Sequence, residues 1–173
     1  MQKNDLNVTL LMAMSINGMI AEPNDKVPWT QPIWDNFFAL VKDYGSLIIG
    51  RRTYEEMLVE GELAKIGDIP VAVLSRTPRP PEGRTVFVKN AQEALAYIAG
   101  KGLKRTLVGG GASIALLFLT SRLVNDIILD IDPILMAQGI PLLASMPWTR
   151  RPKFVEAKPL GGDCVRLQYR FED

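Results

Sequence analysis

The chain has 173 residues, a length typical of one domain, with 47% hydrophobic and 23% charged residues. Its 20 basic and 19 acidic residues leave a net charge of +1, so the charge pattern does not favour nucleic-acid or membrane-surface binding. Histidine is absent and Cys164 is the single cysteine, which excludes Ser-His-Asp catalysis, zinc clusters and intrachain disulfides. A single cysteine fits a reducing cytoplasm, and no apolar stretch is long enough to span a bilayer.

Short apolar runs alternate with helical patterns along most of the chain. The apolar runs predict strands over 8–14, 46–49, 69–74, 85–88, 106–108 and 124–131, of which the first two are expected to be buried. The helical patterns cover 33–44, 51–58, 90–99 and 112–120. At the third helix, Asn90 is the predicted cap, with Glu93 three residues on as in a capping box.

The C-terminal end changes character. Residues 154–160 and 164–171 alternate around Gly161-Gly162-Asp163, which predicts an antiparallel hairpin with one covered face. We therefore expect a single α/β domain over 1–173, in which a mostly parallel central sheet ends in an antiparallel hairpin.

Three predicted strands end in Gly or Ser just before a helix or a polar turn: Gly50-Arg51-Arg52-Thr53, Ser75-Arg76-Thr77 and Gly109-Gly110-Gly111-Ala112-Ser113. Ligands of open parallel sheets bind at the carboxyl ends of strands, and helix N-termini there attract phosphate. The three arginines add positive charge that suits a ligand with several phosphates, such as a dinucleotide. The alternative is ordinary turns and solvated arginines. The glycines do not form the GxGxxG fingerprint, because Ile114 stands at its third glycine position.

The first predicted strand leads into a turn at Asn17-Gly18 and then a proline-containing loop. Trp29 and Trp34 could line a pocket for a flat heterocycle, or could equally be core or helix-face aromatics. Asp35 lies in the first turn of the next helix, where a carboxylate favours the helix dipole whether or not it is catalytic. We take Trp29 and Trp34 as the candidate substrate-binding residues, and Asp35 with Asn17 as the candidate catalytic residues.

Four segments in order resemble the dihydrofolate reductase-like superfamily: 13–21 (AMSINGMIA), 47–55 (LIIGRRTYE), 73–77 (VLSRT) and 107–112 (LVGGGA). They look most like the branch formed by the C-terminal reductase domain of the bifunctional riboflavin deaminase-reductase. The resemblance implies a three-layer α/β fold and NADPH as the hydride donor. It also implies a homodimer formed through the C-terminal half.

The resemblance implies roles by motif position. Gly50, Arg51, Arg52 and Thr53 would hold the pyrophosphate and adenosine side, and Ser75 with Arg76 the 2′-phosphate. Gly109, Gly110, Gly111, Ala112 and Ser113 would form the second phosphate-binding helix start, with a cis peptide between Gly109 and Gly110. Ala13 and Ile20 would flank the nicotinamide.

The substrate half departs from both family standards. Folate reductases place a carboxylate where Trp34 stands, with Asp35 one position further on. The riboflavin-type motif has aspartate at Asn17 and a basic residue at Met19. The implied function is therefore NADPH-dependent reduction of a small pyrimidine- or pterin-type heterocycle, similar to 5-amino-6-(5-phosphoribosylamino)uracil reductase. Asp35 and Glu22 are candidate proton donors, and Asn17 could orient the substrate. The alternatives are a dihydrofolate reductase and an NADPH-binding protein without turnover.

Overall fold

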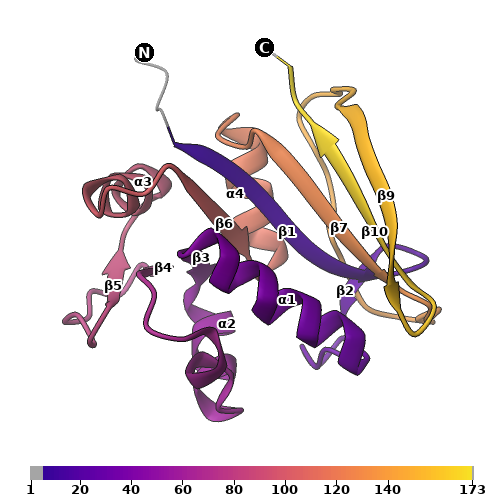
Figure 1. Cartoon of the computed structure of the whole chain (residues 1–173), viewed down its shortest axis with the longest axis horizontal. Helices are drawn as coiled ribbons and strands as arrows, with labels where there is room; N and C mark the ends of the chain where they lie inside the picture. The colour runs from indigo at the N-terminus through magenta and orange to yellow at the C-terminus, as the bar shows by residue number, and fades with distance from the viewer. Residues whose placement is uncertain (1–5, 173) are drawn as a thin grey trace.

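A computed structural model describes residues 6–172 and shows one eight-stranded sheet with helices on both sides (Figure 1). The strand order is β5-β4-β3-β6-β1-β7-β10-β9, and the first six strands in this order are parallel. Strand β10 runs antiparallel to β7, and β9 runs antiparallel to β10, which confirms the predicted hairpin. The predicted fold class, a mostly parallel α/β sheet with an antiparallel C-terminal hairpin, is therefore confirmed.

The strands are β1 (Asn7–Ser15), β2 (Met19–Ala21), β3 (Leu47–Gly50), β4 (Val71–Leu74), β5 (Thr85–Val88), β6 (Arg105–Gly109), β7 (Asp126–Asp132), β8 (Ile140–Pro141), β9 (Lys153–Gly161) and β10 (Cys164–Arg170). The helices are α1 (Gln31–Tyr44), α2 (Arg51–Val59), α3 (Ala91–Gly100) and α4 (Ala112–Thr120), with a 3₁₀ turn η1 (Glu62–Ile66). The small β2–β8 sheet and η1 were not predicted, because segments this short carry little periodicity.

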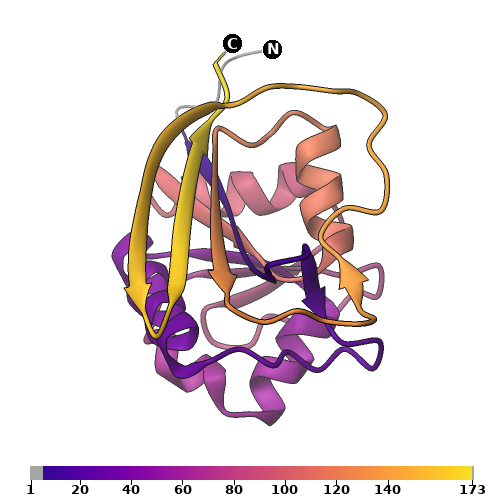
Figure 2. The same cartoon turned by 90° about the vertical axis from the view of Figure 1, so that its right-hand side faces the viewer.

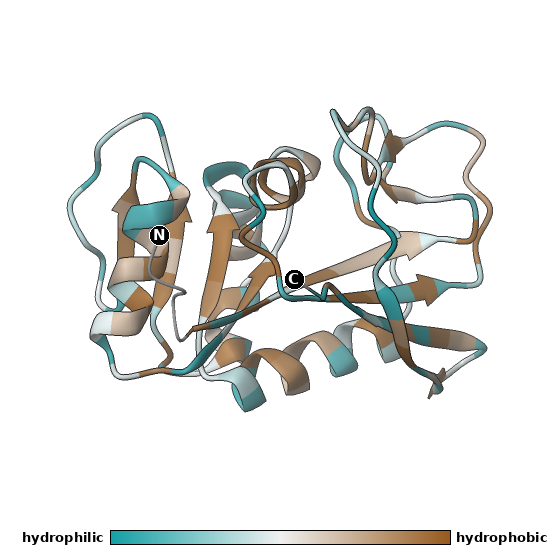
Figure 3. Ribbon diagram, turned by 90° about the horizontal axis from the view of Figure 1, so that it is seen from above, coloured by the Kyte–Doolittle hydropathy of each residue, from teal (hydrophilic) through white to brown (hydrophobic). Residues whose placement is uncertain are grey.

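The two faces of the sheet bury separate apolar clusters. One cluster joins α1 and α2 to alternate strand residues such as Leu11, Leu47 and Ile49. The other cluster joins α3 and α4 to the strand residues that point to the opposite face of the sheet, such as Leu10 and Ile48. Figure 3 shows the result: the strands in the middle of the molecule are largely apolar, and most hydrophilic residues lie on loops and outer helix faces. Because both faces are covered, the central strands are apolar runs rather than alternating ones.

Helix α1 is tied to the sheet at its N-terminus. The hydroxyl of its cap residue Thr30 does not cap the helix; it and the Thr30 N–H both donate to Asp132 Oδ2 at 2.8 Å. At the other end Gly45 adopts a left-handed conformation with φ of 71°, a common C-terminal helix stop. The Asp132 contacts fix where the first turn of α1 lies over β7.

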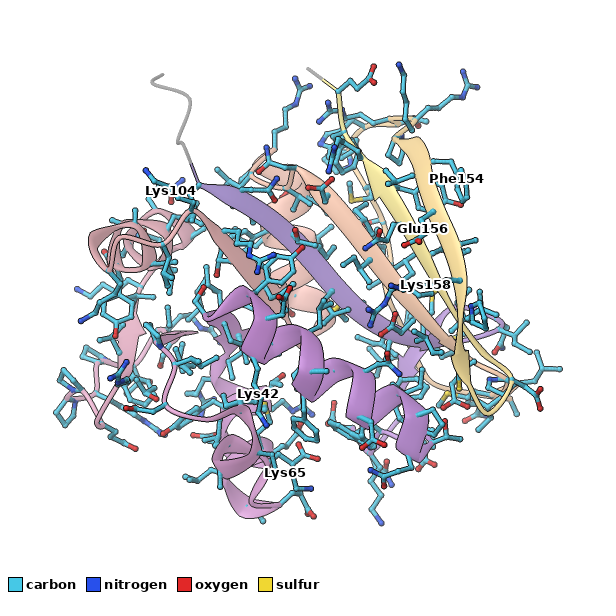
Figure 4. The ribbon with its side chains drawn as sticks, viewed as in Figure 1. Lys42, Lys65, Lys104, Phe154, Glu156 and Lys158 are labelled. Carbon is cyan, nitrogen blue, oxygen red and sulfur yellow. The ribbon has the colours of Figure 1, made fainter. Side chains whose placement is uncertain are left out.

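The expectation that the hairpin has one covered face is wrong for β9. Every β9 residue except Leu160 is exposed, and Phe154 retains 61% of its accessible surface. The reason is position, because β9 is the last strand of the sheet (Figure 2). Helix α1 reaches only the end of β9, where Asn36 Nδ2 lies 3.3 Å from Leu160 O. Phe154, Glu156 and Lys158 lie along this outer strand in Figure 4.

No helix within residues 6–172 is both long and apolar enough to cross a membrane.

Candidate functional site

The predicted ligand motifs lie in one row along the carboxyl edge of the sheet. Gly50 at the end of β3 is in register with Leu74 at the end of β4, which is followed by Ser75 and Arg76. On the other side, Gly109 at the end of β6 is in register with Leu11 of β1, two residues before Ala13. The fold therefore brings the three predicted strand-end motifs and the end of β1 onto neighbouring strands, in the order β4, β3, β6, β1.

The N-termini of α2 and α4 meet at the glycine loop. A Cβ atom on Gly110 would lie 2.4 Å from Thr53 Cγ2, and one on Gly50 would lie 3.0 Å from Ile114 Cγ1. Gly110 and Gly111 also have left-handed φ values of 62° and 86°. Close approach and backbone conformation thus both require glycine at position 110. Two helix N-termini this close concentrate unpaired N–H groups and positive dipole ends in one place.

The implied cis peptide between Gly109 and Gly110 is not found. All peptide bonds among the described residues are trans. The chain instead turns through two successive left-handed glycines, Gly110 and Gly111.

Arg51 and an arginine that the sequence motifs did not single out, Arg79, converge on one carboxylate. Arg51 Nη1 lies 3.2 Å from Glu55 Oε1, and Arg79 Nη2 lies 2.6 Å from the same oxygen. The hydrogen bond from Arg79, with the charges of both arginines, holds the pKa of Glu55 below its usual value. The i,i+4 spacing of Arg51 and Glu55 was readable from the sequence, but the approach of Arg79 from another loop was not.

The other two arginines of the row differ in their contacts. Arg52 forms an ion pair with Asp25, in the loop that follows β2. Arg76 is exposed and forms no ion pair within residues 6–172. The preceding Ser75 is buried, and its hydroxyl donates to Thr77 O and accepts from Thr77 N. Ser75 therefore shapes the turn that presents Arg76.

At the β1 end of the row, the side chain of Asn17 forms hydrogen bonds within the protein. Its Oδ1 accepts from Ser15 Oγ at 2.8 Å and from the Met136 N–H at 3.1 Å, while Nδ2 donates to Met136 O at 2.8 Å. The amide thus joins the β1–β2 turn to the loop after β7. Ala13 is half-buried on β1, and Ile20 is buried on β2.

The predicted substrate residues lie on or before α1. Trp34 is half-buried and stacks on Phe38, with ring centroids 5.8 Å apart and planes 19° apart. Trp29 is also half-buried, in the loop before the helix. Asp35 is exposed and accepts a hydrogen bond from Gln31 Nε2 at 2.8 Å, one turn earlier on the same helix. Asp35 thus lies on the outer face of α1, one position away from Trp34 and its partners.

Two buried acidic residues on β7 were missed by the sequence reasoning. Asp132 holds Thr30, and Asp130 forms a bidentate pair with Arg166, both contacts 2.7 Å long. They alternate with apolar residues on β7, a strand that was predicted over 124–131 without a role for its acidic residues. Only the strand pairing of β7 with β10 shows which arginine lies opposite Asp130.

Two hollows lie away from this row. One of about 660 Å³ is at the opposite edge of the sheet, between Asn7, Tyr44 and Lys104. Another of about 320 Å³ lies between Pro70, Tyr97 and Lys101. Within residues 6–172, no three histidine, cysteine or acidic side chains are grouped so that they could hold a metal ion.

No family model matches the chain. Two Bacillus subtilis (strain 168) proteins, both named as uncharacterized, are similar to it. YwjB is 24% identical over 166 residues, which span 92% of this chain and 95% of YwjB. YyaP is 23% identical, with 95% of this chain and 94% of YyaP covered.

Several solved structures are similar to the chain in shape. A protein from Shewanella sp. PV-4, whose name refers to riboflavin biosynthesis, has a TM-score of 0.79 at 21% identity, covering 96% of this chain and 99% of that one. The dihydrofolate reductase of Enterococcus faecalis, complexed with NADP(H), has a TM-score of 0.76 at 21% identity, covering 96% and 97%. The bifunctional deaminase-reductase of Thermotoga maritima has a TM-score of 0.71 at 15% identity, covering 95% of this chain and 56% of that one.

The chain therefore has the dihydrofolate reductase-like fold, as the sequence motifs indicated.

Proposed function

We propose that this protein is an NADPH-dependent reductase of a small pyrimidine- or pterin-type heterocycle. The observation that carries the proposal is the row of phosphate-binding features at the carboxyl edge: two helix N-termini in contact at Gly110 and Thr53, beside Arg51 and Arg76. Support comes from the shared fold with the Enterococcus faecalis dihydrofolate reductase, whose structure holds NADP(H).

The residues of this row fit a dinucleotide. Gly50, Thr53 and the backbone of the Gly109–Gly111 loop would bind the pyrophosphate, because N–H groups at helix starts bind anions. Arg76, exposed after β4, would bind the phosphate on the adenosine ribose. When bound, NADPH supplies a hydride to the heterocycle. Ala13 and Ile20 would then flank the nicotinamide at the end of β1, and the loop bearing Trp29 would help exclude water.

The part of this chain in the reaction is to align two bound molecules and supply a proton. Fixing both reactants can provide up to roughly 7–11 kcal/mol of the barrier reduction in favourable cases. Asp35 and Glu22 stay the candidate proton donors, together with water. Asn17, whose amide is held by Ser15 and Met136, would act by fixing the shape of the β1–β2 turn.

The first test is a fluorescence titration of the protein with NADPH and, separately, NADH, using Trp29, Trp34 and Trp148 as the signal. We expect micromolar NADPH binding and much weaker NADH binding. Because one charged hydrogen bond is worth about 1.5–3 kcal/mol, Arg76→Ala should weaken NADPH binding by about tenfold or more. Absence of binding to either nucleotide would reject the proposed function.

Steady-state oxidation of NADPH in the presence of single heterocycles then separates the catalytic alternatives. Turnover of dihydrofolate that is lost in Asp35→Asn would identify a dihydrofolate reductase. Turnover of an aminopyrimidine supports the proposal. If this turnover survives Asp35→Asn, as the exposed position of Asp35 favours, Glu22 and water are left as the candidate proton donors. Tight NADPH binding without oxidation across pterins and aminopyrimidines would identify a binding protein without turnover.

A further inference from the structure

Two arginine side chains meet at the adenosine end of the proposed dinucleotide site. Arg51 belongs to the first turn of α2, and Arg79 to the loop that follows β4. Their guanidinium nitrogens lie 3.2 Å and 2.6 Å from the same atom, Glu55 Oε1. Glu55 is partly exposed, with 37% of its side-chain surface accessible, so this point can be reached from solvent.

Arg79 is held in place from a second direction. Its guanidinium carbon lies 5.5 Å from the centre of the Phe87 ring on β5. The Phe87 ring in turn packs edge-on against Tyr54 of α2, with centroids 5.3 Å apart. An arginine that is already oriented loses less side-chain entropy when it binds a ligand. Arg79 is therefore set in position before any anion arrives.

The charge balance here favours an anion larger than one carboxylate. Arg51, Arg76 and Arg79 carry three positive charges near the ends of β3 and β4, and Glu55 carries the negative charge that pairs with two of them. Arg76 forms no ion pair within residues 6–172. A phosphate monoester has about −1.5 to −2 charge at pH 7 and three acceptor oxygens, so it can pair with more guanidinium groups than Glu55 does.

The geometry points to Arg79 and Glu55 as the residues that set the preference for a ribose phosphate: Glu55 holds Arg51 and Arg79 where the phosphate will bind, and the phosphate then takes over Glu55's contacts. This inference rests on the proposed function, because the phosphate is that of NADPH. Glu55 acts as an internal competitor, which lowers phosphate affinity while keeping the two guanidinium groups together. Arg79 acts as a phosphate ligand in addition to Arg76.

The test compares wild type, Arg79→Ala, Glu55→Gln and the control Arg84→Ala by titration with NADPH and with NADH. Arg84 is a suitable control because it forms a similar exposed ion pair, with Asp68 at 2.7 Å, away from this cluster. We expect Arg79→Ala to weaken NADPH binding about tenfold, the loss of one charged hydrogen bond, and to leave NADH binding within about twofold. Glu55→Gln should tighten NADPH binding about threefold or more, because the amide oxygen still accepts hydrogen bonds from the two arginines while the competing charge is removed.

Calorimetry with adenosine 2′-monophosphate provides a second readout that does not involve the nicotinamide, and we expect the same order of affinities. An unchanged ratio of NADPH to NADH affinity in Arg79→Ala would overturn the inference and leave the proposed function standing. Weaker NADPH binding in Glu55→Gln would overturn the role of Glu55. A wild-type protein that binds neither nucleotide would overturn the proposed function and this inference together. Circular dichroism melting of each variant checks that the fold is retained.

Discussion

Single glycines decide whether the two helix N-termini can meet at the carboxyl edge. Gly110 combines a left-handed φ of 62° with contact against Thr53, whereas Gly102 has a left-handed φ of 75° but open space around it. An alanine at Gly102 would therefore meet backbone strain alone, whereas an alanine at Gly110 would meet both strain and crowding. Both glycines are left-handed, but of the two only Gly110 has a neighbour within 4 Å of the place that a Cβ atom would occupy.

We expect Gly110→Ala to lower the free energy of unfolding by about 2–5 kcal/mol, because left-handed strain of about 1–2 kcal/mol adds to about 1–3 kcal/mol of crowding. Gly102→Ala should show the strain alone, about 1–2 kcal/mol. Urea denaturation measures both. Equal losses in the two variants would show that Thr53 moves aside and that the contact is not restrictive.

At the scale of elements, β7 and β10 are joined by a buried ion pair as well as by backbone hydrogen bonds. Arg166 and Asp130 have side chains 5% and 2% exposed and form two contacts of 2.7 Å. The same two strands also carry a more exposed pair of similar length, in which Arg170, 59% exposed, lies 2.6 Å from Asp126, 13% exposed. Burial is the main difference between them, so the two pairs form a matched comparison.

Arg166→Met should destabilise the protein by about 3–5 kcal/mol, because it leaves the Asp130 carboxylate buried without a partner. The double variant Asp130→Leu/Arg166→Met should recover most of this loss, since no buried charge remains. Arg170→Met, at the exposed pair, should cost less than about 1 kcal/mol. Urea unfolding of the four proteins gives these values, and a double variant as unstable as Arg166→Met would contradict the explanation.

At the scale of the whole molecule, strand β9 leaves one edge of the sheet open. Its outer side has no neighbouring strand, and Phe154 and Val155 are 61% and 47% exposed. Open strand edges with apolar side chains favour pairing with another strand. Antiparallel pairing of β9 with a second copy about Ala157 would place Glu156 opposite Lys158 in both directions. Pro159 has no N–H, so this pairing would have fewer hydrogen bonds than the length of β9 allows.

We therefore expect the homodimer implied by the family resemblance to form through β9. Light scattering after size-exclusion chromatography should give twice the chain mass for wild type and the chain mass for Phe154→Lys. Leu135→Lys is the control, because Leu135 is 72% exposed in the loop after β7. A monomeric wild type, or a monomer produced by Leu135→Lys, would argue against this interface.

The sequence by itself determined the main helices and strands, the fold class and the glycine and arginine motifs at the strand ends. Apolar runs such as 8–14 and 106–108 are buried on both faces of a parallel sheet, so their pattern is local and readable. The strand-end glycines are equally local, because a helix start is encoded by the few residues around it. These features lie within about ten residues of chain, and the structure places each close to its predicted position.

Only the tertiary structure decided which side chains meet. Arg79 reaches Glu55 across 24 residues, Asn17 reaches Met136 across 119, and Asp132 reaches Thr30 across 102. Such contacts follow from strand order and the placement of helices, which no local pattern specifies. Exposure is decided in the same way: Asp35 faces outward and β9 lies uncovered because of where α1 and the hairpin sit in the assembled sheet. Interactions between residues close in sequence determine the helices and strands, and the packing of these elements determines which side chains come into contact.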